Sequence, residues 1–193
     1  MTEFFALLSN SGQVEQDSKL WEDLTKSTRL TYLNEHETIL VADTHQEYIY
    51  FIVQGCIRSF FKRADGAETT CWFFGNGDMV FSESSLLYKQ PSQLSMQATC
   101  PTKAYRISTQ NFELITGAYP EFRNVCLRLQ ASYHQKHFEH NQVVLRLPRA
   151  SRFNKFLSQN PRIIGQAKEK DIANFLHMHP NSFSALKRDS MQR

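Results

Sequence analysis

Hydrophobic and polar positions follow two different periods along the chain, and these divide it into helical ends around a β-rich middle. Near the start, residues 3–8 and 15–26 predict two short helices, because their apolar residues recur at helical spacing. Later, short runs rich in β-branched and aromatic residues are separated by turn residues; they cover 29–33, 37–41, 47–63, 67–74, 93–99 and 103–108. Closely spaced strands of this kind predict a small antiparallel barrel or jelly roll.

Glycines mark two turns inside this β-rich part. Gly55 interrupts the longest run, residues 47–63, and separates it into two strands. The dipeptide Asp65-Gly66 lies between two strand-like runs, which is a strong hairpin signal. We therefore expect a break at Gly55 and a tight hairpin at Asp65-Gly66.

After residue 109 the pattern becomes helical. Residues 109–119 predict a short helix, and 120–147 predict one helix of about seven turns, without glycine or internal proline. One stripe recurs along the long helix at spacings of three and four: Phe122, Cys126, Leu129, Tyr133, His137, His140, Val144 and Leu147. A helix this long exposes most of its length unless something packs along it, so we expect a two-fold homodimer through this stripe.

The C-terminal segment predicts three helical pieces. Residues 149–161 form the first, residues 162–167 a connector, and residues 170–188 two short helices joined by a tight turn. Pro180 suits the first turn of the last helix, because its missing N–H is not needed there. The residues left pointing outward are polar or basic: Lys170, Asn181, Ser182, Ser184, Lys187 and Arg188. Such a face can bind base edges and phosphates in a major groove, although a plain helical hairpin shows the same spacing.

The distribution of charge favours the DNA-binding interpretation. The 193 residues carry a formal net charge of +3, but from Pro148 onward nine lysine and arginine residues stand against three acidic residues. The rest of the chain is mildly acidic. A basic tail on an acidic body predicts a polyanionic partner for the tail, whereas a solvated basic face is the alternative.

Other classes of protein find little support in the sequence. No apolar run approaches the ~20 residues of a membrane helix, and residues 1–16 do not resemble a signal peptide, so we expect a cytoplasmic protein without membrane contact. Cys56, Cys71, Cys100 and Cys126 are scattered and predict buried thiols, with no metal site. A cupin-type jelly-roll enzyme would need clustered histidines on the inner strands. The β-rich part has only His36 and His45, so we expect no catalytic residue and no enzymatic activity.

The whole arrangement resembles the cyclic-AMP receptor/fumarate–nitrate regulator (Crp/Fnr) family, and especially its compact Bacteroidetes-type members. The resemblance rests on "YFIVQGCIRSFF", "FFGNGDMVFSESSLL", the strand ending in "AYRIS", and "KDIANFLHMHPNSFSALKR". It implies an α+β fold: a cyclic nucleotide-binding-like jelly roll over residues 1–118, a dimerisation helix over 119–147, and a helix-turn-helix domain over 148–193. It also implies a dimeric transcriptional regulator, with DNA and RNA polymerase as partners.

The family's cyclic-nucleotide pocket is altered in this sequence. The positions that correspond to it are Gly77, Asp78, Ser82, Glu83, Ser84, Ser92 and Gln93. Serine replaces the family's glycine before Glu83, and Ser92 or Gln93 stands where the family places the arginine that pairs with the cyclic phosphate. A phosphate without a cationic partner loses its strongest interaction, so we expect no tight binding of cyclic AMP. No cofactor is assigned, and the effector stays unknown.

The DNA-reading segment departs from the family as well. His177 occupies the turn where relatives have glycine, Ala185 stands where many have a base-reading arginine, and few residues follow for a wing hairpin. The alternative is therefore an effector-binding or adaptor module whose DNA-binding unit has decayed. His134, His137 and His140 repeat every three residues, which drifts around a helix, so we expect helix-surface or seam histidines and no metal site.

Overall fold

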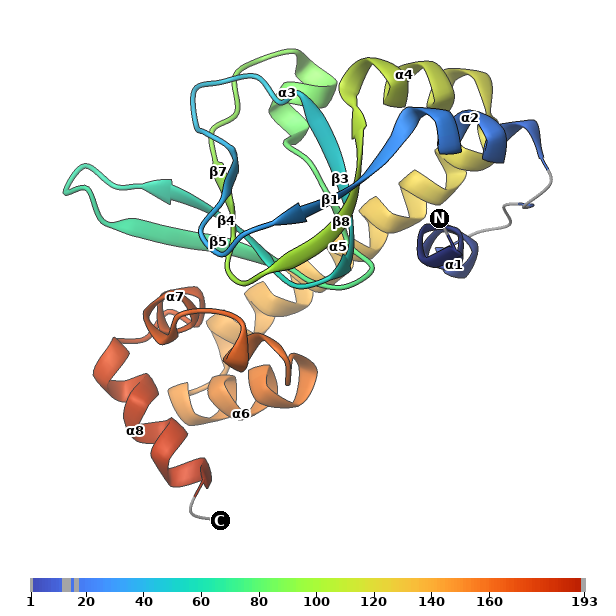
Figure 1. Cartoon of the computed structure of the whole chain (residues 1–193). Coiled ribbons are helices and arrows are strands. Elements are labelled where there is room, and N and C mark those ends of the chain that lie inside the picture. The colour runs from blue at the N-terminus through green and yellow to red at the C-terminus, as the bar shows by residue number, and fades with distance from the viewer. Residues whose placement is uncertain (1, 12–14, 16–17, 192–193) are drawn as a thin grey trace.

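The computed structural model describes residues 2–11, 15 and 18–191, and it places two β-sheets between groups of helices (Figure 1). The strands are β1 (Thr28–Leu33), β2 (Thr38–Leu40), β3 (Tyr48–Gln54), β4 (Ile57–Lys62), β5 (Glu68–Phe74), β6 (Met79–Val80), β7 (Ser95–Ala98) and β8 (Thr102–Ser108). The helices are α1 (Thr2–Ser11), α2 (Lys19–Ser27), α3 (Glu83–Tyr88), α4 (Thr109–Ala118), α5 (Pro120–Arg146), α6 (Arg149–Gln159), α7 (Glu169–Phe175) and α8 (Pro180–Met191), with a 3-10 turn at Ile163–Gly165.

The strands form the predicted jelly roll. One sheet has the order β1-β8-β3-β6 and the other β2-β7-β4-β5, and the neighbouring strands are antiparallel. The predicted hairpin joins β4 to β5, where Asp65 Oδ1 accepts the N–H of Ala67 at 3.0 Å and Gly66 has φ +79°. β5 is an edge strand of its sheet, because only β4 pairs with it among the described residues.

Gly55 forms the turn between β3 and β4 at a crowded position. Its φ is +116°, and a Cβ placed on it would lie 2.3 Å from Thr102 Oγ1 and 2.7 Å from Thr102 Cα. The chain is held there on both sides, since Gly55 N–H donates to Asn76 Oδ1 at 3.0 Å and Cys56 N–H donates to Thr102 Oγ1 at 3.1 Å. Both the backbone conformation and the space therefore require glycine.

Two elements were not predicted from the sequence. β6 has two residues and α3 has six, so neither is long enough to show a period of its own. α3 begins at Glu83 and ends before Lys89, which adopts a left-handed conformation at φ +54°. This short helix shapes one wall of the pocket described below.

The described helices cover the sandwich from two directions. α1, α2, α4 and the start of α5 share one buried cluster with β3 and β8, at the upper right of Figure 1. A second cluster continues from the sheets into the C-terminal helices, and it includes Trp72, Phe73, Phe153, Phe175 and Phe183. The predicted division at residue 147 stays a prediction, but buried side chains are continuous across it.

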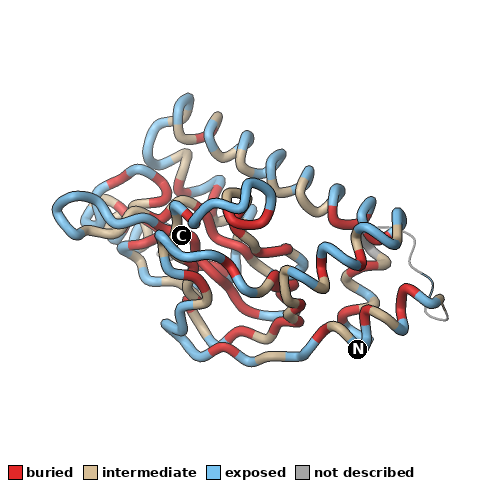
Figure 2. The backbone as a smooth tube through the Cα atoms, turned by 90° about the horizontal axis from the view of Figure 1, so that it is seen from above, coloured by how far each residue is buried: buried red, intermediate tan, exposed pale blue. Residues whose placement is uncertain are grey.

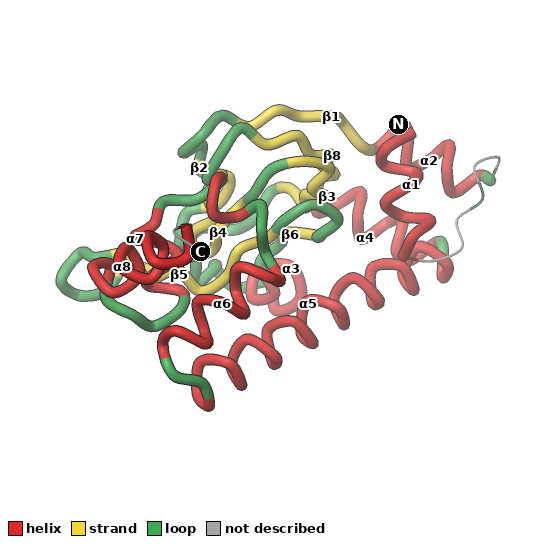
Figure 3. Tube along the Cα trace, turned by 90° about the horizontal axis from the view of Figure 1, so that it is seen from below, coloured by secondary structure: helices red, strands yellow, loops and turns green. Residues whose placement is uncertain are grey.

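The long helix α5 runs along one side of the molecule, as Figure 3 shows from below. Its predicted seam faces the chain's own sheets: Phe122 and Cys126 are buried, Tyr133 packs on Trp72 and Phe74, and His140 packs on Phe175. The outer side of the helix is exposed over most of its length (Figure 2). The predicted stripe therefore packs in large part within one chain, and its role in self-association stays a prediction.

The exposed side of α5 carries a second apolar stripe. Leu127, Phe138 and Leu145 are 60%, 59% and 83% exposed, and Ala131 lies between the first two. Their spacing of four, seven and seven residues places them on one heptad seam. No described helix is long and apolar enough to cross a membrane.

Candidate effector pocket and nucleic-acid interface

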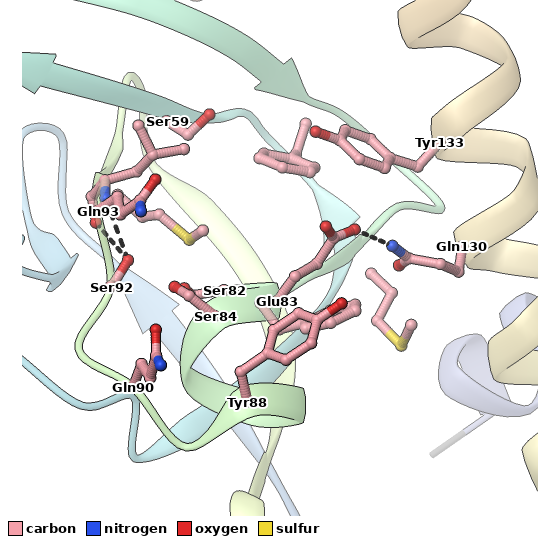
Figure 4. Close-up of a pocket in the computed structure, with 15 residues that line it drawn as sticks. Ser59, Ser82, Glu83, Ser84, Tyr88, Gln90, Ser92, Gln93, Gln130 and Tyr133 are labelled. Carbon is pink, nitrogen blue, oxygen red and sulfur yellow. Dashed lines mark hydrogen bonds between the residues drawn. The ribbon is translucent and has the colours of Figure 1, made fainter.

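A cavity of about 370 Å³ lies between the jelly roll, α3 and α5 (Figure 4). Serine and glutamine side chains form its polar wall, and the other wall is aromatic and thioether-rich. The lining residues are Ser59, Phe74, Met79, Phe81, Ser82, Glu83, Ser84, Tyr88, Gln90, Ser92, Gln93, Leu94, Met96, Gln130 and Tyr133. A concave site of this size with a few convergent polar groups is suited to a small molecule.

The structure brings together most, but not all, of the predicted pocket residues. Ser82, Glu83, Ser84, Ser92 and Gln93 line the cavity. Gly77 and Asp78 lie outside it; Asp78 Oδ2 accepts the N–H of Gly75 at 2.8 Å, and its Oδ1 pairs with Lys136 Nζ at 2.8 Å. These two residues therefore shape a neighbouring loop and hold it to α5.

Glu83 connects the pocket to α5. Its carboxylate accepts a hydrogen bond from Gln130 Nε2, drawn as a dashed line in Figure 4, and lies 3.3 Å from His134 Nε2. Gln130 and His134 are one helical turn apart, so they reach the same carboxylate from one face. Any ligand that engages Glu83 must compete with contacts to the long helix.

Tyr133 supplies an aromatic wall and a hydroxyl group. Its ring stacks on Phe74 with centroids 5.6 Å apart and planes 21° apart. Burial is the largest cause that raises the pKa of Tyr133 to about 12, and the negative charge of Glu83 adds to it. The hydroxyl therefore keeps its proton at neutral pH and is available as a hydrogen-bond donor.

The charge of this pocket does not suit an anion. Among the described residues that line it, none is lysine or arginine, and Glu83 is acidic. Ser92 is 1% exposed and both donates to Leu94 C=O at 2.8 Å and accepts from Leu94 N–H at 3.2 Å, so it shapes the loop. Gln93 lines the cavity and is exposed, which makes it the position from which a longer cation could reach a ligand.

Sequence reasoning missed the residues that other elements contribute to the pocket. Ser59 comes from β4, Tyr88 from α3, and Gln130 and Tyr133 from α5. The spacing of Tyr133 along α5 fits a residue of the predicted seam as well as it fits a residue of the pocket. No local pattern distinguishes a seam residue from one that faces a cavity in the same chain.

The predicted DNA-reading segment forms two helices with a sharp turn. Ala173 of α7 is fully buried, and Phe183 of α8 packs on Phe153 of α6 with ring centroids 5.3 Å apart. His177 has φ +53° in the turn, the left-handed conformation that glycine adopts most easily. The helix α8 then begins with Asn181 N–H donating to His179 Nδ1 at 3.2 Å.

The outward residues of this segment are in part already engaged. Lys170, Asn181, Ser184 and Arg188 are exposed, whereas Ser182 and Lys187 are half-buried. Glu169 Oε1 pairs with Lys187 Nζ at 2.7 Å, and Glu169 Oε2 accepts from Ser184 Oγ at 3.2 Å. The hydrogen bond and charge of Lys187 lower the pKa of Glu169, so the carboxylate stays charged and orders this face.

The three histidines of α5 have separate partners. His134 contacts Glu83 and Gln130, His137 Nδ1 accepts from Asn141 Nδ2 at 3.2 Å, and His140 Nε2 lies 3.2 Å from Phe175 C=O. Burial lowers the pKa of His140 to about 4, so its ring is neutral at physiological pH. The histidines therefore serve three different contacts along the helix.

Comparisons with known proteins agree with this architecture. The family model of the cyclic nucleotide-binding domain matches residues 30–118. FixK2 from Bradyrhizobium japonicum is 20% identical over 86% of this chain and 85% of its own, with a TM-score of 0.73. A transcriptional regulator assigned to the Crp/Fnr family from Eubacterium rectale is 15% identical over 89% of this chain and 82% of its own, with a TM-score of 0.69.

A third structure is relevant to the pocket. The regulatory subunit of a cAMP-independent protein kinase A from Trypanosoma brucei is 22% identical over 74% of this chain and 50% of its own, with a TM-score of 0.55. A triple variant of that subunit, in which one substitution introduces an arginine, has cyclic AMP bound in its A site. A comparison with curated protein sequences finds no match.

The resemblance to Bacteroidetes-type members stays a prediction, but the broader assignment does not depend on it. The fold is shared with the two solved regulators over 86% and 89% of this chain. Residues 30–118 therefore match the family model of the cyclic nucleotide-binding domain, and the chain has the fold of the solved Crp/Fnr regulators.

Proposed function

We propose that the protein is a DNA-binding transcriptional regulator that acts as a homodimer. The observation that carries the proposal is the exposed polar face of α8, with Asn181, Ser184 and Arg188, at the end of a basic C-terminal segment. An α-helix with such a face fits the major groove, and the surrounding cations meet the phosphates. The fold shared with FixK2 and the Eubacterium rectale regulator supports the same function.

The proposed dimer contact is the outer stripe of α5. Leu127, Ala131, Phe138 and Leu145 recur at heptad positions, and His134 and Asn141 fill the polar positions between them. Large apolar side chains exposed in one row along a helix favour a second copy as the partner, because the same row on that copy is complementary under two-fold symmetry. This contact would place two α8 helices on one DNA duplex.

For the sensor pocket we propose an effector other than cyclic AMP. A cyclic phosphate would be desolvated beside Glu83 without a cation among the described lining residues. The Trypanosoma brucei subunit, which is cAMP-independent and has cyclic AMP bound in a variant with an added arginine, supports this interpretation.

The alternative is an effector-binding or adaptor module with a decayed DNA unit. Lys187 and Ser184 are both held by Glu169, and this favours a reading face that meets a partner other than DNA. In the DNA-binding interpretation, Lys187 and Ser184 give up their contacts with Glu169 and contact DNA phosphates instead. The two functions therefore differ in one measurable quantity, the affinity for DNA at low salt.

Removing two cations from α8 is expected to weaken DNA binding. In a mobility-shift titration with the protein's own upstream DNA, Lys187→Gln/Arg188→Gln should lower the affinity by about 10- to 100-fold at low salt. It should also reduce the slope of log affinity against log salt by about 1 to 2, because up to two phosphate contacts are lost. The matched control is Lys19→Gln/Lys26→Gln on α2, at the opposite end of the molecule, which should leave both quantities unchanged. A wild-type protein that gives no shift at low salt would contradict the proposed function and favour the adaptor module.

Gln93→Arg is expected to create cyclic-AMP binding. Calorimetry should detect no saturable binding to the wild type at concentrations where the variant binds, and the gain should be about 10- to 100-fold, the range of a charge-assisted hydrogen bond. Gln93→Met retains a side chain of similar length without charge, and it should behave as the wild type does. Micromolar binding of cyclic AMP to the wild type would show that the missing cation does not decide the specificity of the pocket.

A further inference from the structure

A buried ion pair joins the jelly roll to the DNA-reading segment. Arg58 of β4 places Nη1 3.2 Å from Asp171 Oδ1 of α7, and its Nη2 donates to Gln97 Oε1 at 3.1 Å and to Glu68. The side chains of Arg58 and Asp171 are only 6% and 9% exposed. Because salt screens buried charges poorly, this contact persists under conditions that weaken surface ion pairs.

The edge of β5 makes a second contact with α7. The N–H of Thr70 points away from β4 and donates to Asn174 Oδ1 at 2.9 Å. An unpaired N–H on an edge strand normally needs water or another strand. Here the side chain of Asn174 caps it, so α7 lies along the free edge of the sheet (Figure 1).

Aromatic rings fill the space between these polar contacts. Phe175 of α7 has its ring centroid 5.2 Å from Phe73 and 5.6 Å from Trp72, both on β5. On its other side it stacks on His140 of α5, with centroids 3.8 Å apart and planes 8° apart. β5, α5 and α7 thus meet at one buried side chain.

This contact leaves the DNA-reading face free. Asn181, Ser184 and Arg188 of α8 remain exposed while α7 is docked on the sheet. The connection from α5 is short, since only Leu147 and Pro148 separate it from α6. The docked arrangement therefore determines where α8 lies relative to the dimer helix without covering the residues that would read DNA.

We infer that Asp171 and Asn174 are positioning residues that, through Arg58 and Thr70, set the spacing between the two DNA half-sites that a dimer can read. The inference rests on the proposed function. A dimer that binds two half-sites gains avidity only when the distance between its reading helices matches the DNA, and a rigid attachment makes that match selective. Loosening the attachment widens the range of accepted spacings and leaves each reading helix intact.

The test compares full-length dimers on DNA duplexes with varied spacing. Each duplex carries two copies of a half-site selected from random DNA by the wild-type protein, with the centre-to-centre spacing changed in steps of one base pair. The wild type should prefer one spacing by at least about tenfold over a spacing two base pairs longer, because two fixed reading helices follow the DNA turn. In Asp171→Ala/Asn174→Ala the preference should fall below about threefold, with single half-site affinity within about twofold of the wild type.

Two variants separate positioning from folding. Asp171→Glu/Asn174→Gln keeps a carboxylate for Arg58 and an amide oxygen for Thr70, so it should retain more of the spacing preference than the double alanine variant. Asn154→Ala changes an exposed asparagine on α6 and should have no effect on the spacing preference.

The inference is overturned if the double alanine variant keeps the wild-type preference. It is also overturned if that variant loses half-site and paired-site binding equally, since this would show a structural role alone. Failure of the wild type to bind any duplex would instead contradict the proposed function.

Discussion

Replacing Gly55 by alanine is expected to lower the free energy of unfolding by about 3 to 5 kcal/mol, because strain and overlap act at the same residue. The new Cβ would lie 2.3 Å from Thr102 Oγ1 and 2.7 Å from Thr102 Cα, and the second of these is a backbone atom that cannot rotate away. At φ +116° an alanine is also strained in its own backbone. Urea unfolding followed by circular dichroism would measure the change.

Gly66→Ala is the matched control for this prediction. Gly66 also has a positive φ, +79°, but no heavy atom lies within 4 Å of the position that its Cβ would take. We expect a loss of about 1 kcal/mol there, the cost of the left-handed conformation alone. Equal losses for the two variants would show that the contact with Thr102 relaxes without cost.

Phe138→Glu is expected to weaken the proposed homodimer by at least about 100-fold, because it removes a large apolar anchor and places two like charges near the proposed two-fold axis. Phe138 is 59% exposed in the single chain and lies midway along the outer stripe of α5. Sedimentation velocity over a range of concentrations would give the dissociation constant. Binding to a paired half-site should fall with the dimer, while binding to a single half-site should not.

Leu114→Glu is the control for charge on an exposed apolar residue. Leu114 is 64% exposed on α4, away from the outer stripe, so the dimer should remain. A monomeric wild type, or a Phe138→Glu variant with unchanged self-association, would contradict the assignment of this face. Loss of the dimer in the Leu114 variant alone would place the contact at α4.

The fold could be predicted from the sequence because its signals are local. The Asp65-Gly66 turn, Gly55 and the runs of β-formers each mark an element within a few residues, and the jelly roll follows from their spacing. The long helix was predicted for the same reason. The sequence could not show which side of α5 packs on its own sheets, because α5 has two stripes at almost the same period. Phe122 and Tyr133 belong to the stripe that packs on the sheets, whereas Leu127 and Phe138 belong to the other.

The sites were predictable only where one segment supplies them. Ser82, Glu83 and Ser84 are consecutive and were found, whereas Gln130 and Tyr133 reach the same cavity from a helix more than 40 residues later. Arg58 and Asp171 are more than 100 residues apart, and each alone has the pattern of an ordinary surface charge. A buried contact of this kind depends on how two elements pack, and the spacing of hydrophobic and polar residues along the sequence does not predict it.

The buried cluster that crosses from the sheets into the C-terminal helices bears on how such a protein can change over generations. Phe175 of α7 packs against both β5 and α5, so the hairpin of α7 and α8 is not an independently packed unit. A recombination event that exchanges residues 148–191 for those of a relative would bring in a new α7 whose side chains do not match the edge of β5. Under the proposed function, changes in DNA specificity at α8 can accumulate one surface residue at a time, whereas exchange of the whole hairpin requires that β4 and β5 change with it.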